Sequence, residues 1–370
     1  MTFKIGIIVN PIAGIGGKKA WKGTDNIDEA WKIYERGERY AHNRVELALQ
    51  SIPSDLPIKF LYCAEPMGAK LIDRFTFKKE LVYQPSKLPT TAEDTKNACK
   101  VFLDKNVDLI IFGGGDGTAR DIAQVVGTSK PILGIPSGVK MFSGCFLYYP
   151  QDLGRLIEGM ISGAIEFKPE DVLDINEKLF RENKVEVKLY STVITPNAEG
   201  LIQGGKISSS HTSLETFKGI ANELYEQYDL FTGVTILGTG SSVYYTFKAL
   251  GIEKTLLGVD ILENGKLIHK DVDEEVLYKI VKDREIKIVL TPIGGQGFLL
   301  GRGNQQISAR ALNVAKKREL IVIATEEKIR QIKELQIDLE EKITFDNTQN
   351  GYIKVIVGYH LYTLKKLRIA

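Results

Sequence analysis

Residues 109–122 read Leu-Ile-Ile-Phe-Gly-Gly-Gly-Asp-Gly-Thr-Ala-Arg-Asp-Ile, and this stretch constrains the fold more than any other part of the chain. Its apolar start predicts a buried strand, and the residues from Ala119 onwards predict a helix. The glycines between them let backbone N–H groups approach an anion without a Cβ clash, and the N-terminus of the next helix favours negative charge. A strand, a glycine turn and a helix in this order indicate an α/β domain with a phosphate-binding turn.

The rest of the first 165 residues alternates strand and helix patterns in the same way. Predicted strands cover residues 4–9, 58–62, 81–83, 107–112 and 131–135, and predicted helices cover 43–51, 67–75, 92–105, 119–126 and 153–163. Thr90-Thr91-Ala92-Glu93 fits a capping box at the start of the third helix. Alternating units of this kind predict a largely parallel sheet, which binds ligands at the carboxyl ends of its strands.

Near residue 165 the pattern changes to longer strands, so we place a domain boundary there. Residues 1–165 are predicted to form an N-terminal nucleotide-phosphate-binding domain, and residues 166–370 a C-terminal domain. The second part has predicted strands at 167–174, 184–195, 234–237, 256–262, 286–291, 319–324 and 352–357, predicted helices at 214–227, 241–250, 274–281 and 309–316, and a tight hairpin at Asn264-Gly265. The predicted fold class is α/β, with an N-terminal Rossmann-like parallel sheet, a second α/β (α+β) domain, and the site in the cleft between them.

Composition excludes several classes of protein. The formal charge is 49 − 47 = +2, which is too balanced for a general nucleic-acid binder. Cys63, Cys99 and Cys145 are odd in number and far apart, which argues against a disulfide framework or a structural zinc site and favours a reducing, cytoplasmic compartment. No stretch is suited to a signal peptide or a membrane span, so neither a membrane nor a nucleic acid is an expected partner.

Asp116 is the candidate catalytic residue. A carboxylate would repel phosphate, so its place among the glycines suits a proton acceptor or a metal-linked group beside a phosphate chain. The alternative is a structural turn in which Asp116 is the N-cap of the helix. Asp121 lies five residues further on and is a candidate metal ligand, or else a cap of the helix predicted at 119–126.

Two more glycine-rich turns follow strands of the first domain. Asn10-Pro-Ile-Ala-Gly14 follows the first strand, and Lys18, Lys19 and Lys22 come soon after it as possible cations over a phosphate chain. Gly138, Lys140 and Ser143 follow the strand at 131–135, and Lys140 and Ser143 could reach a ligand. The alternative for both turns is an ordinary solvated loop.

Two glycine clusters mark the second domain. Gly238-Thr-Gly240-Ser-Ser joins a predicted strand to a predicted helix, and residues 291–306 contain five glycines, one cation and three amides. Arg302 and Asn304 in the longer cluster suit recognition of a phosphate and of a base or sugar. Since no histidine lies in a glycine cluster, we expect all four histidines to be structural, and no nucleophile pattern of the Ser/His/Asp or Cys/His type is visible.

These motifs together resemble a known family. Gly114-Gly-Asp-Gly-Thr118 is similar to the GGDGT signature shared by NAD kinases, diacylglycerol and sphingosine kinases and 6-phosphofructokinases, and Asn10-Pro-Ile-Ala-Gly14 resembles the N-P-x-[SA]-G element of the lipid kinases. The combination of NPIAGIGG, KGTD, GGGDGTARD, GIPSGVKM and GGQGFLLGRGNQQIS resembles the ATP-NAD kinase-like family of archaea and bacteria, which includes a bacterial protein encoded with acetoin catabolism.

The resemblance implies a kinase. In NAD kinases the GGDGT aspartate contacts the 2′-hydroxyl of the NAD adenosine ribose and is proposed to deprotonate it, a role that falls here on Asp116. The implied nucleotide and phosphate ligands are Asn10, Gly113, Gly114, Gly115, Gly117, Thr118, Gly138, Lys140, Gly238, Gly240, Arg302 and Asn304. Asn222-Glu223 is not matched to the family's Asn-Glu adenosine motif, because it lies in a predicted amphipathic helix and is expected to face solvent.

The predicted reaction is transfer of a phosphoryl group from ATP or polyphosphate, with Mg²⁺ or another divalent cation, to a hydroxyl acceptor, with the 2′-hydroxyl of NAD favoured. The alternatives are a kinase for another small polyol or lipid head group, and a non-catalytic NAD or nucleotide sensor. Family resemblance also implies a homo-oligomer.

Overall fold

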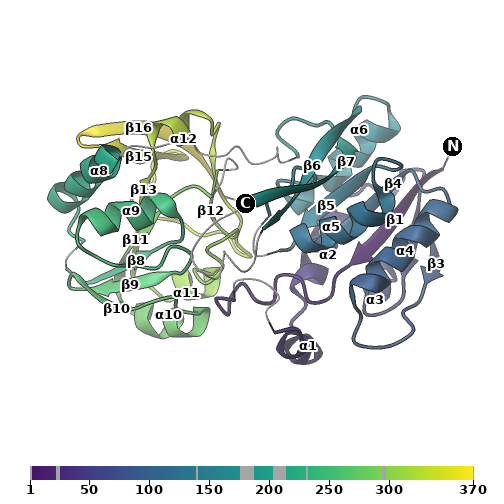
Figure 1. The fold of residues 1–370 in the computed structure, drawn as a ribbon, viewed down its shortest axis with the longest axis horizontal. Coiled ribbons are helices and arrows are strands. Elements are labelled where there is room, and N and C mark those ends of the chain that lie inside the picture. Colours follow the sequence, from purple (N-terminus) through teal and green to yellow (C-terminus); the bar gives the residue numbers. More distant parts are fainter. Residues whose placement is uncertain are drawn as a thin grey trace. The chain divides into compact units, whose positions relative to one another are not determined.

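The computed structural model of the protein describes residues 2–21, 26–138, 141–175, 187–202, 214–230, 232–293 and 297–369. The chain divides into two compact units (Figure 1). The first unit contains Met1–Gly16 and Lys22–Lys206, and the second contains Gly17–Trp21 and Ile207–Ala370. Each unit is therefore built mainly from one half of the sequence, with a five-residue segment near the N-terminus belonging to the second unit.

A five-stranded parallel sheet forms the centre of the first unit, as the alternating pattern predicts. Its strands are β1 (Phe3–Val9), β2 (Ile58–Cys63), β3 (Lys78–Tyr83), β4 (Leu109–Gly114) and β5 (Ile132–Pro136), in the order β3-β2-β1-β4-β5. Residues in β1, β4 and β5 are almost all buried, because helices cover both faces of the sheet. In the register of β1 and β4, Val9 is paired with Gly113, so both strands end at the same edge.

Helices connect these strands. They are α1 (Ile27–Glu35), α2 (Tyr40–Gln50), α3 (Ala69–Ile72), α4 (Ala92–Asp104), α5 (Asp116–Val126) and α6 (Leu153–Ile161), with a 3₁₀ turn at Pro150–Asp152. A capping box is present at the start of α4, but one residue later than the predicted Thr90–Glu93 pair: Thr91 is the N-cap, and its amide donates to Asp94 Oδ2 at 2.8 Å. The helix predicted at 67–75 is only one turn long. The sequence analysis missed α1, which begins where the Asn26 side chain accepts a hydrogen bond from the Glu29 amide.

A two-stranded antiparallel ribbon, β6 (Phe167–Ile175) and β7 (Val187–Pro196), belongs to the first unit by its contacts. Val172 and Val193 are fully buried and share a hydrophobic cluster with Ile122 of α5. The predicted boundary lies near residue 165, where the strand pattern changes. The compact units divide later, after Lys206, because this ribbon packs on the first unit.

The second unit is built on a nine-stranded mixed sheet. Its strands are β8 (Val234–Leu237), β9 (Asp260–Glu263), β10 (Lys266–His269), β11 (Glu285–Leu290), β12 (Phe298–Leu300), β13 (Lys317–Ile323), β14 (Leu335–Ile337), β15 (Tyr352–Gly358) and β16 (Leu361–Ile369), in the order β10-β9-β8-β11-β13-β15-β16-β14-β12. The four strands β8, β11, β13 and β15 are parallel. The predicted hairpin is confirmed, since Asn264 and Gly265 both have positive φ and join antiparallel β9 and β10.

The helices of the second unit are α8 (Leu214–Gln227), α9 (Ser241–Ala249), α10 (Glu274–Val281), α11 (Ala309–Asn313) and α12 (Glu326–Arg330). Buried aliphatic clusters lie on both faces of the sheet, one with Ile288 and Val322 and the other with Val289 and Ile321. The chain thus alternates β and α elements in this half too, and both units are α/β structures with their own hydrophobic cores.

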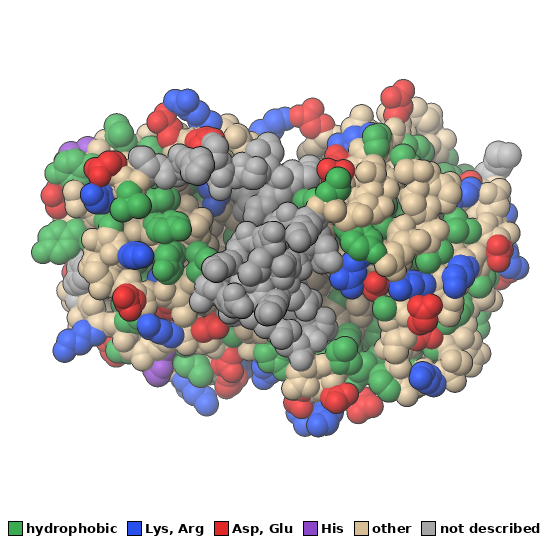
Figure 2. Space-filling view, viewed as in Figure 1, with side chains coloured by type: hydrophobic (Ala, Val, Ile, Leu, Met, Phe, Trp, Pro, Cys, Tyr) green, Lys and Arg blue, Asp and Glu red, His purple; other side chains and the backbone are tan. Residues whose placement is uncertain are grey.

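The surface carries mixed charge. On the face drawn in Figure 2, cationic and anionic side chains are interspersed over the described residues of both units, in agreement with the net charge of +2. None of the helices in the described ranges is both long enough and apolar enough to span a bilayer.

Close packing of β1 on α4 gives a test of the first core. A Cβ at Gly6 would lie 2.6 Å from the ring of Phe102, which is fully buried. Gly6→Ala is therefore expected to destabilise the protein by about 1–3 kcal/mol through overpacking. Chemical denaturation measures the loss, and the double variant Gly6→Ala/Phe102→Leu should recover part of it. A Gly6→Ala protein as stable as the wild type would show that this contact is looser than described.

Candidate functional site

The strand order of the first unit places a topological switch point between β1 and β4. The chain runs outward from β1 through β2 to β3 on one side, and then from β4 to β5 on the other. In parallel sheets a crevice opens at such a point, outside the carboxyl ends of the two strands. The two segments that leave this edge are the Asn10–Gly14 turn after β1 and the glycine turn after β4, which are the two strongest motifs of the sequence.

These two motifs touch. The side-chain amide of Asn10 donates to the Thr118 hydroxyl at 3.0 Å, and the Asn10 backbone amide donates to the Gly113 carbonyl at 2.9 Å. The Asn10 side-chain oxygen accepts from the Ile12 amide at 3.2 Å, which shapes the turn after β1. The prediction that Asn10 and Thr118 lie at one place is therefore confirmed by a direct hydrogen bond.

The glycines of this turn differ in how much space the fold leaves beside them. A Cβ at Gly113 would lie 2.5 Å from a methyl group of Val45, and one at Gly114 would lie 2.5 Å from the Thr118 hydroxyl. At these two positions the protein itself fills the space. A Cβ at Gly117 would meet no atom of the described residues within 4 Å, so this first-turn position of α5 faces open space. Room beside a helix N-terminus is what an anionic ligand needs.

Asp116 is held firmly although it bears a charge. Its side chain is 8% exposed. Oδ1 accepts from the Ser143 hydroxyl at 2.7 Å and the Ser143 amide at 3.0 Å, and Oδ2 accepts from the Phe142 amide at 2.7 Å. Ser143 is itself fixed, because its hydroxyl oxygen accepts from the Leu173 amide of β6 at 3.0 Å. Three donors orient the carboxylate and offset the cost of burying it.

The alternative role of Asp116 as an N-cap is wrong. The helix α5 begins at Asp116, its N-cap is Gly115, and the Asp116 side chain bonds to Phe142 and Ser143 rather than to its own helix. The capping alternative for Asp121 is also wrong, since Asp121 lies in the middle of α5. Its carboxylate is 3.6 Å from Arg120 Nε. Among the residues that the structure describes, no cluster of three or more acidic, His or Cys side chains could hold a metal by itself.

The turn after β5 completes this edge of the sheet. The Ser137 amide donates to the Gly114 carbonyl at 3.0 Å, so the turn that carries half-buried Gly138 lies beside the glycine turn of β4. Lys140, another predicted ligand, lies outside the described residues, as do Lys22 and the KGTD motif that begins there.

Burial affects the thiols and the histidine near this region in opposite ways. Burial raises the pKa of the Cys99 thiol to about 12 and that of Cys145 well above its usual range, with a further upward effect from the Asp116 charge on Cys145. Both stay protonated at neutral pH and are weak nucleophiles. His42 is buried, and burial lowers the pKa of its imidazole.

In the second unit the predicted residues also come together. Thr239, between Gly238 and Gly240, donates its backbone amide to Asn304 Oδ1 at 2.9 Å and its hydroxyl to the Gly303 carbonyl at 3.0 Å. Asn304 is fully buried, and its amide group donates to the Leu299 carbonyl at 2.8 Å. Asn304 therefore tethers the turn after β8 to the segment after β12, with both ends of its side chain bonded inside the fold.

Arg302, which the sequence suggests as a phosphate-binding cation, is buried in the structure. It is 4% exposed, its Nε lies 3.4 Å from Asp338, and its guanidinium carbon lies 3.9 Å from the centre of the Phe298 ring. Its guanidinium therefore has a carboxylate and an aromatic face as neighbours within the second unit, and it contributes to the core of that unit.

Glu223 also departs from expectation. It was predicted to face solvent with Asn222, yet its side chain is fully buried. Its carboxylate accepts from the His360 amide at 2.9 Å and lies 3.0 Å from the His360 ring nitrogen. The prediction failed because helical periodicity does not reveal that the turn between β15 and β16 packs on α8.

Ser143 is predicted as a residue that could reach a ligand. The sequence does not predict its hydrogen bond to Asp116, nor the hydrogen bond from the Phe142 amide to the same carboxylate. Within the described part of the chain, two backbone amides and one hydroxyl, 26 and 27 residues further along, donate to Asp116. Backbone donors leave no trace in residue type, so only the tertiary structure could identify them.

Comparison with known proteins agrees with the two-part organisation. The family model described as the ATP-NAD kinase N-terminal domain matches residues 5–165, and that described as the ATP-NAD kinase C-terminal domain matches residues 233–367. Neither the curated proteins nor the solved structures gave a match to this chain.

The buried pair of the second unit leads to a stability prediction. Arg302→Ala should destabilise the protein by about 3–5 kcal/mol, because it leaves the Asp338 carboxylate buried without its cation. Thermal unfolding is the measurement, and Arg302→Met/Asp338→Leu should recover most of the loss. The matched control is Arg330→Ala, which removes an exposed ion pair with Glu326 and should cost less than about 1 kcal/mol. Equal losses for Arg302→Ala and the control would contradict a buried pair.

Proposed function

As a member of the ATP-NAD kinase family, to which matches along most of its length assign it, the chain is a kinase, and we propose that it phosphorylates the 2′-hydroxyl of NAD with ATP as donor. The observation that carries this proposal is the meeting of Asn10, Thr118 and Asp116 at the switch point of the first sheet. A carboxylate held in a glycine-lined edge suits a reaction in which a hydroxyl group attacks a phosphoryl group.

Asp116 is the proposed base. It would accept the proton of the acceptor hydroxyl as that oxygen attacks the γ-phosphorus of ATP, and the bond to the β–γ bridging oxygen breaks so that ADP leaves. Ser143 and Phe142 position the carboxylate through the three hydrogen bonds described above. Because such reactions depend mainly on positioning and charge neutralisation, a rigidly held base is an advantage.

The phosphate chain is proposed to lie along the glycine turn. Gly113, Gly114 and Gly115 lead into the N-terminus of α5, Gly117 leaves room there, and Thr118 supplies a hydroxyl that Asn10 orients. Gly138 and Lys140 of the turn after β5 are proposed to contact the same ligand. Gly238, Gly240, Arg302 and Asn304 remain proposed ligands of the second unit. The bonds within the fold support indirect action by Asn304, through the shape of the turn after β8.

A divalent cation, with Mg²⁺ as the candidate, fits the donor set without a protein cage. Mg²⁺ commonly binds through one or two carboxylates together with substrate phosphates and water. Asp121 is the proposed carboxylate ligand, with substrate phosphates and water supplying the other ligands. When bound, the cation would neutralise the charge that develops on the transferred phosphoryl group.

The direct test is an acceptor panel. The protein is incubated with Mg²⁺ and either ATP or polyphosphate, and with NAD, NADH, small polyols or a diacylglycerol in turn, and products are identified by mass spectrometry. NADP formation from NAD and ATP is the expected result. A phosphorylated polyol or lipid in place of NADP would show that the acceptor is that compound and not NAD. NAD binding by calorimetry without any product would indicate a sensor.

Asp116→Asn is expected to lower turnover by about 10²–10⁴-fold, because the amide is not a base. NAD binding should fall much less. The amide can keep its oxygen toward Ser143 but loses the bond from the Phe142 amide, so a modest decrease in melting temperature is also expected.

The matched control is Asp104→Asn at the exposed end of α4, which should leave turnover unchanged. Normal turnover of Asp116→Asn would remove Asp116 from the role of base. Normal turnover with a shifted Mg²⁺ dependence would tie it to the metal and make Asp121 the next candidate for the base.

A further inference from the structure

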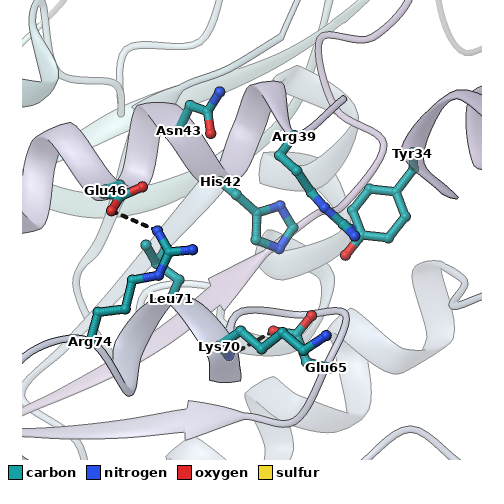
Figure 3. A pocket seen from close by; sticks show the side chains of 9 residues that line it. All are labelled: Tyr34, Arg39, His42, Asn43, Glu46, Glu65, Lys70, Leu71 and Arg74. Atoms are coloured by element: carbon teal, nitrogen blue, oxygen red, sulfur yellow. Dashed lines mark hydrogen bonds and ion pairs between the residues drawn. The ribbon is translucent and has the colours of Figure 1, made fainter. Parts of the chain in front are cut away.

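A small pocket lies on the first unit, one strand away from the proposed catalytic edge. It is lined by Tyr34, Arg39, His42, Asn43, Glu46, Glu65, Lys70, Leu71 and Arg74 (Figure 3). The residues come from the end of α1, the first half of α2, the turn after β2, and α3 with the residues that follow it. Since β2 pairs with β1, the pocket opens at the carboxyl side of the same parallel sheet. None of these residues takes part in the proposed kinase reaction.

Buried polar atoms in the pocket have no partner among the described residues. His42 is 8% exposed, and its Nε2 donates to the Pro66 carbonyl at 3.0 Å. A carbonyl can only accept, so Nε2 carries the hydrogen, and Nδ1 of the neutral ring is an acceptor. Nδ1 of His42 and Nη1 of Arg39 are both buried without a hydrogen bond. Buried polar atoms in folded proteins are normally satisfied, so two adjacent ones indicate room for a ligand.

The charges around the pocket favour an anion. Arg39 lies over the Tyr34 ring, with its guanidinium carbon 3.6 Å from the ring centre, and in Figure 3 it runs between that ring and His42. Within the described parts of the chain, neither Arg39 nor the Lys70 ammonium is paired with a carboxylate. The two acids are engaged, Glu46 with Arg74 at 2.9 Å and Glu65 with the Lys70 amide at 2.7 Å. In addition, the N-terminus of α2 lies at the pocket, and no side chain of the N-cap residue bonds to its first turn. The positive end of the helix dipole there favours an anion.

We propose that this pocket binds inorganic phosphate in a form that still carries a proton. The anionic oxygens would accept from Arg39 and Lys70, and the P–OH group would donate to His42 Nδ1. Burial lowers the pKa of His42, which keeps the ring neutral and able to accept at neutral pH. Sulfate has the same shape but no proton to donate at this pH, so the pocket should prefer phosphate.

The test reads out at His42 itself. The protein is labelled with ¹⁵N in its four histidines, and His42 is assigned by the signal that disappears in His42→Gln. Titration with inorganic phosphate at pH 7.5 should shift the His42 Nδ1 signal and saturate below about 10 mM, an affinity typical of a weak anion site. Sulfate should bind about 10-fold more weakly or worse. AMP and the 2′-phosphate of NADP are almost fully deprotonated at pH 7.5, because the second pKa of a phosphomonoester is about 6, and they should bind as weakly as sulfate. Binding of either as tight as that of inorganic phosphate would overturn the requirement for a proton.

Three variants locate the anion. Arg39→Gln should weaken phosphate binding about 10-fold or more, because a charge-assisted hydrogen bond is lost. Lys70→Gln should weaken it about 3-fold or more. Because Lys70 is exposed, its substitution should leave the fold intact. The matched control is Arg36→Gln, which removes an exposed positive charge at the end of α1 outside the pocket and should change binding less than 2-fold.

Wild-type protein without a saturable His42 shift would overturn the proposal, and so would Arg39→Gln and Lys70→Gln binding phosphate as tightly as the control. Equal binding of sulfate would overturn the requirement for a proton. The result is independent of the proposed kinase activity, because Asp116→Asn should bind phosphate at His42 as the wild type does. Loss of turnover in that variant with an unchanged His42 titration would separate the two sites.

Discussion

The parallel pairing of β1 with β4 is the constraint on which the first unit depends. It aligns Val9 with Gly113, so that the Asn10 turn and the glycine turn leave the sheet side by side. Gly113 and Gly114 are needed because Val45 and Thr118 already fill the space that a Cβ would take. Without this close approach the Asn10–Thr118 hydrogen bond could not form, and the two motifs would remain separate loops on one sheet.

A charged side chain at such an edge is stable only if it is held. Asp116 is buried, and its carboxylate accepts from the Phe142 amide and from the amide and hydroxyl of Ser143, which β6 fixes in turn. The ribbon of β6 and β7 thus contributes to the proposed active site, although it follows the part of the chain that matches the N-terminal family model. This dependence explains why the first compact unit extends beyond residue 165.

Polar residues of the second unit serve its architecture first. Asn304 bonds to the turn after β8 and to Leu299, and Arg302 is buried against Asp338 and Phe298. Residue type alone suggests ligand recognition for both, because an arginine and an asparagine among glycines are typical of phosphate and base contacts. The same groups can instead act within the fold, where Asn304 satisfies buried backbone groups and Arg302 pairs with the Asp338 side chain.

Local pattern in the sequence determined much of this protein: the alternation of strands and helices, the capping box of α4, the Asn264-Gly265 hairpin, and Asn10, Asp116 and Thr118 as residues of one edge. These features depend on neighbours in the chain, on periodicity and on backbone preferences that a sequence displays directly. Only the tertiary structure decided that Phe142 and Ser143 hold Asp116, that Arg302 and Glu223 are buried, and that His42 and Arg39 line a pocket. Each of those facts depends on which distant segment packs against a side chain, and burial, ion pairing and backbone hydrogen bonding at long range leave no local pattern to read.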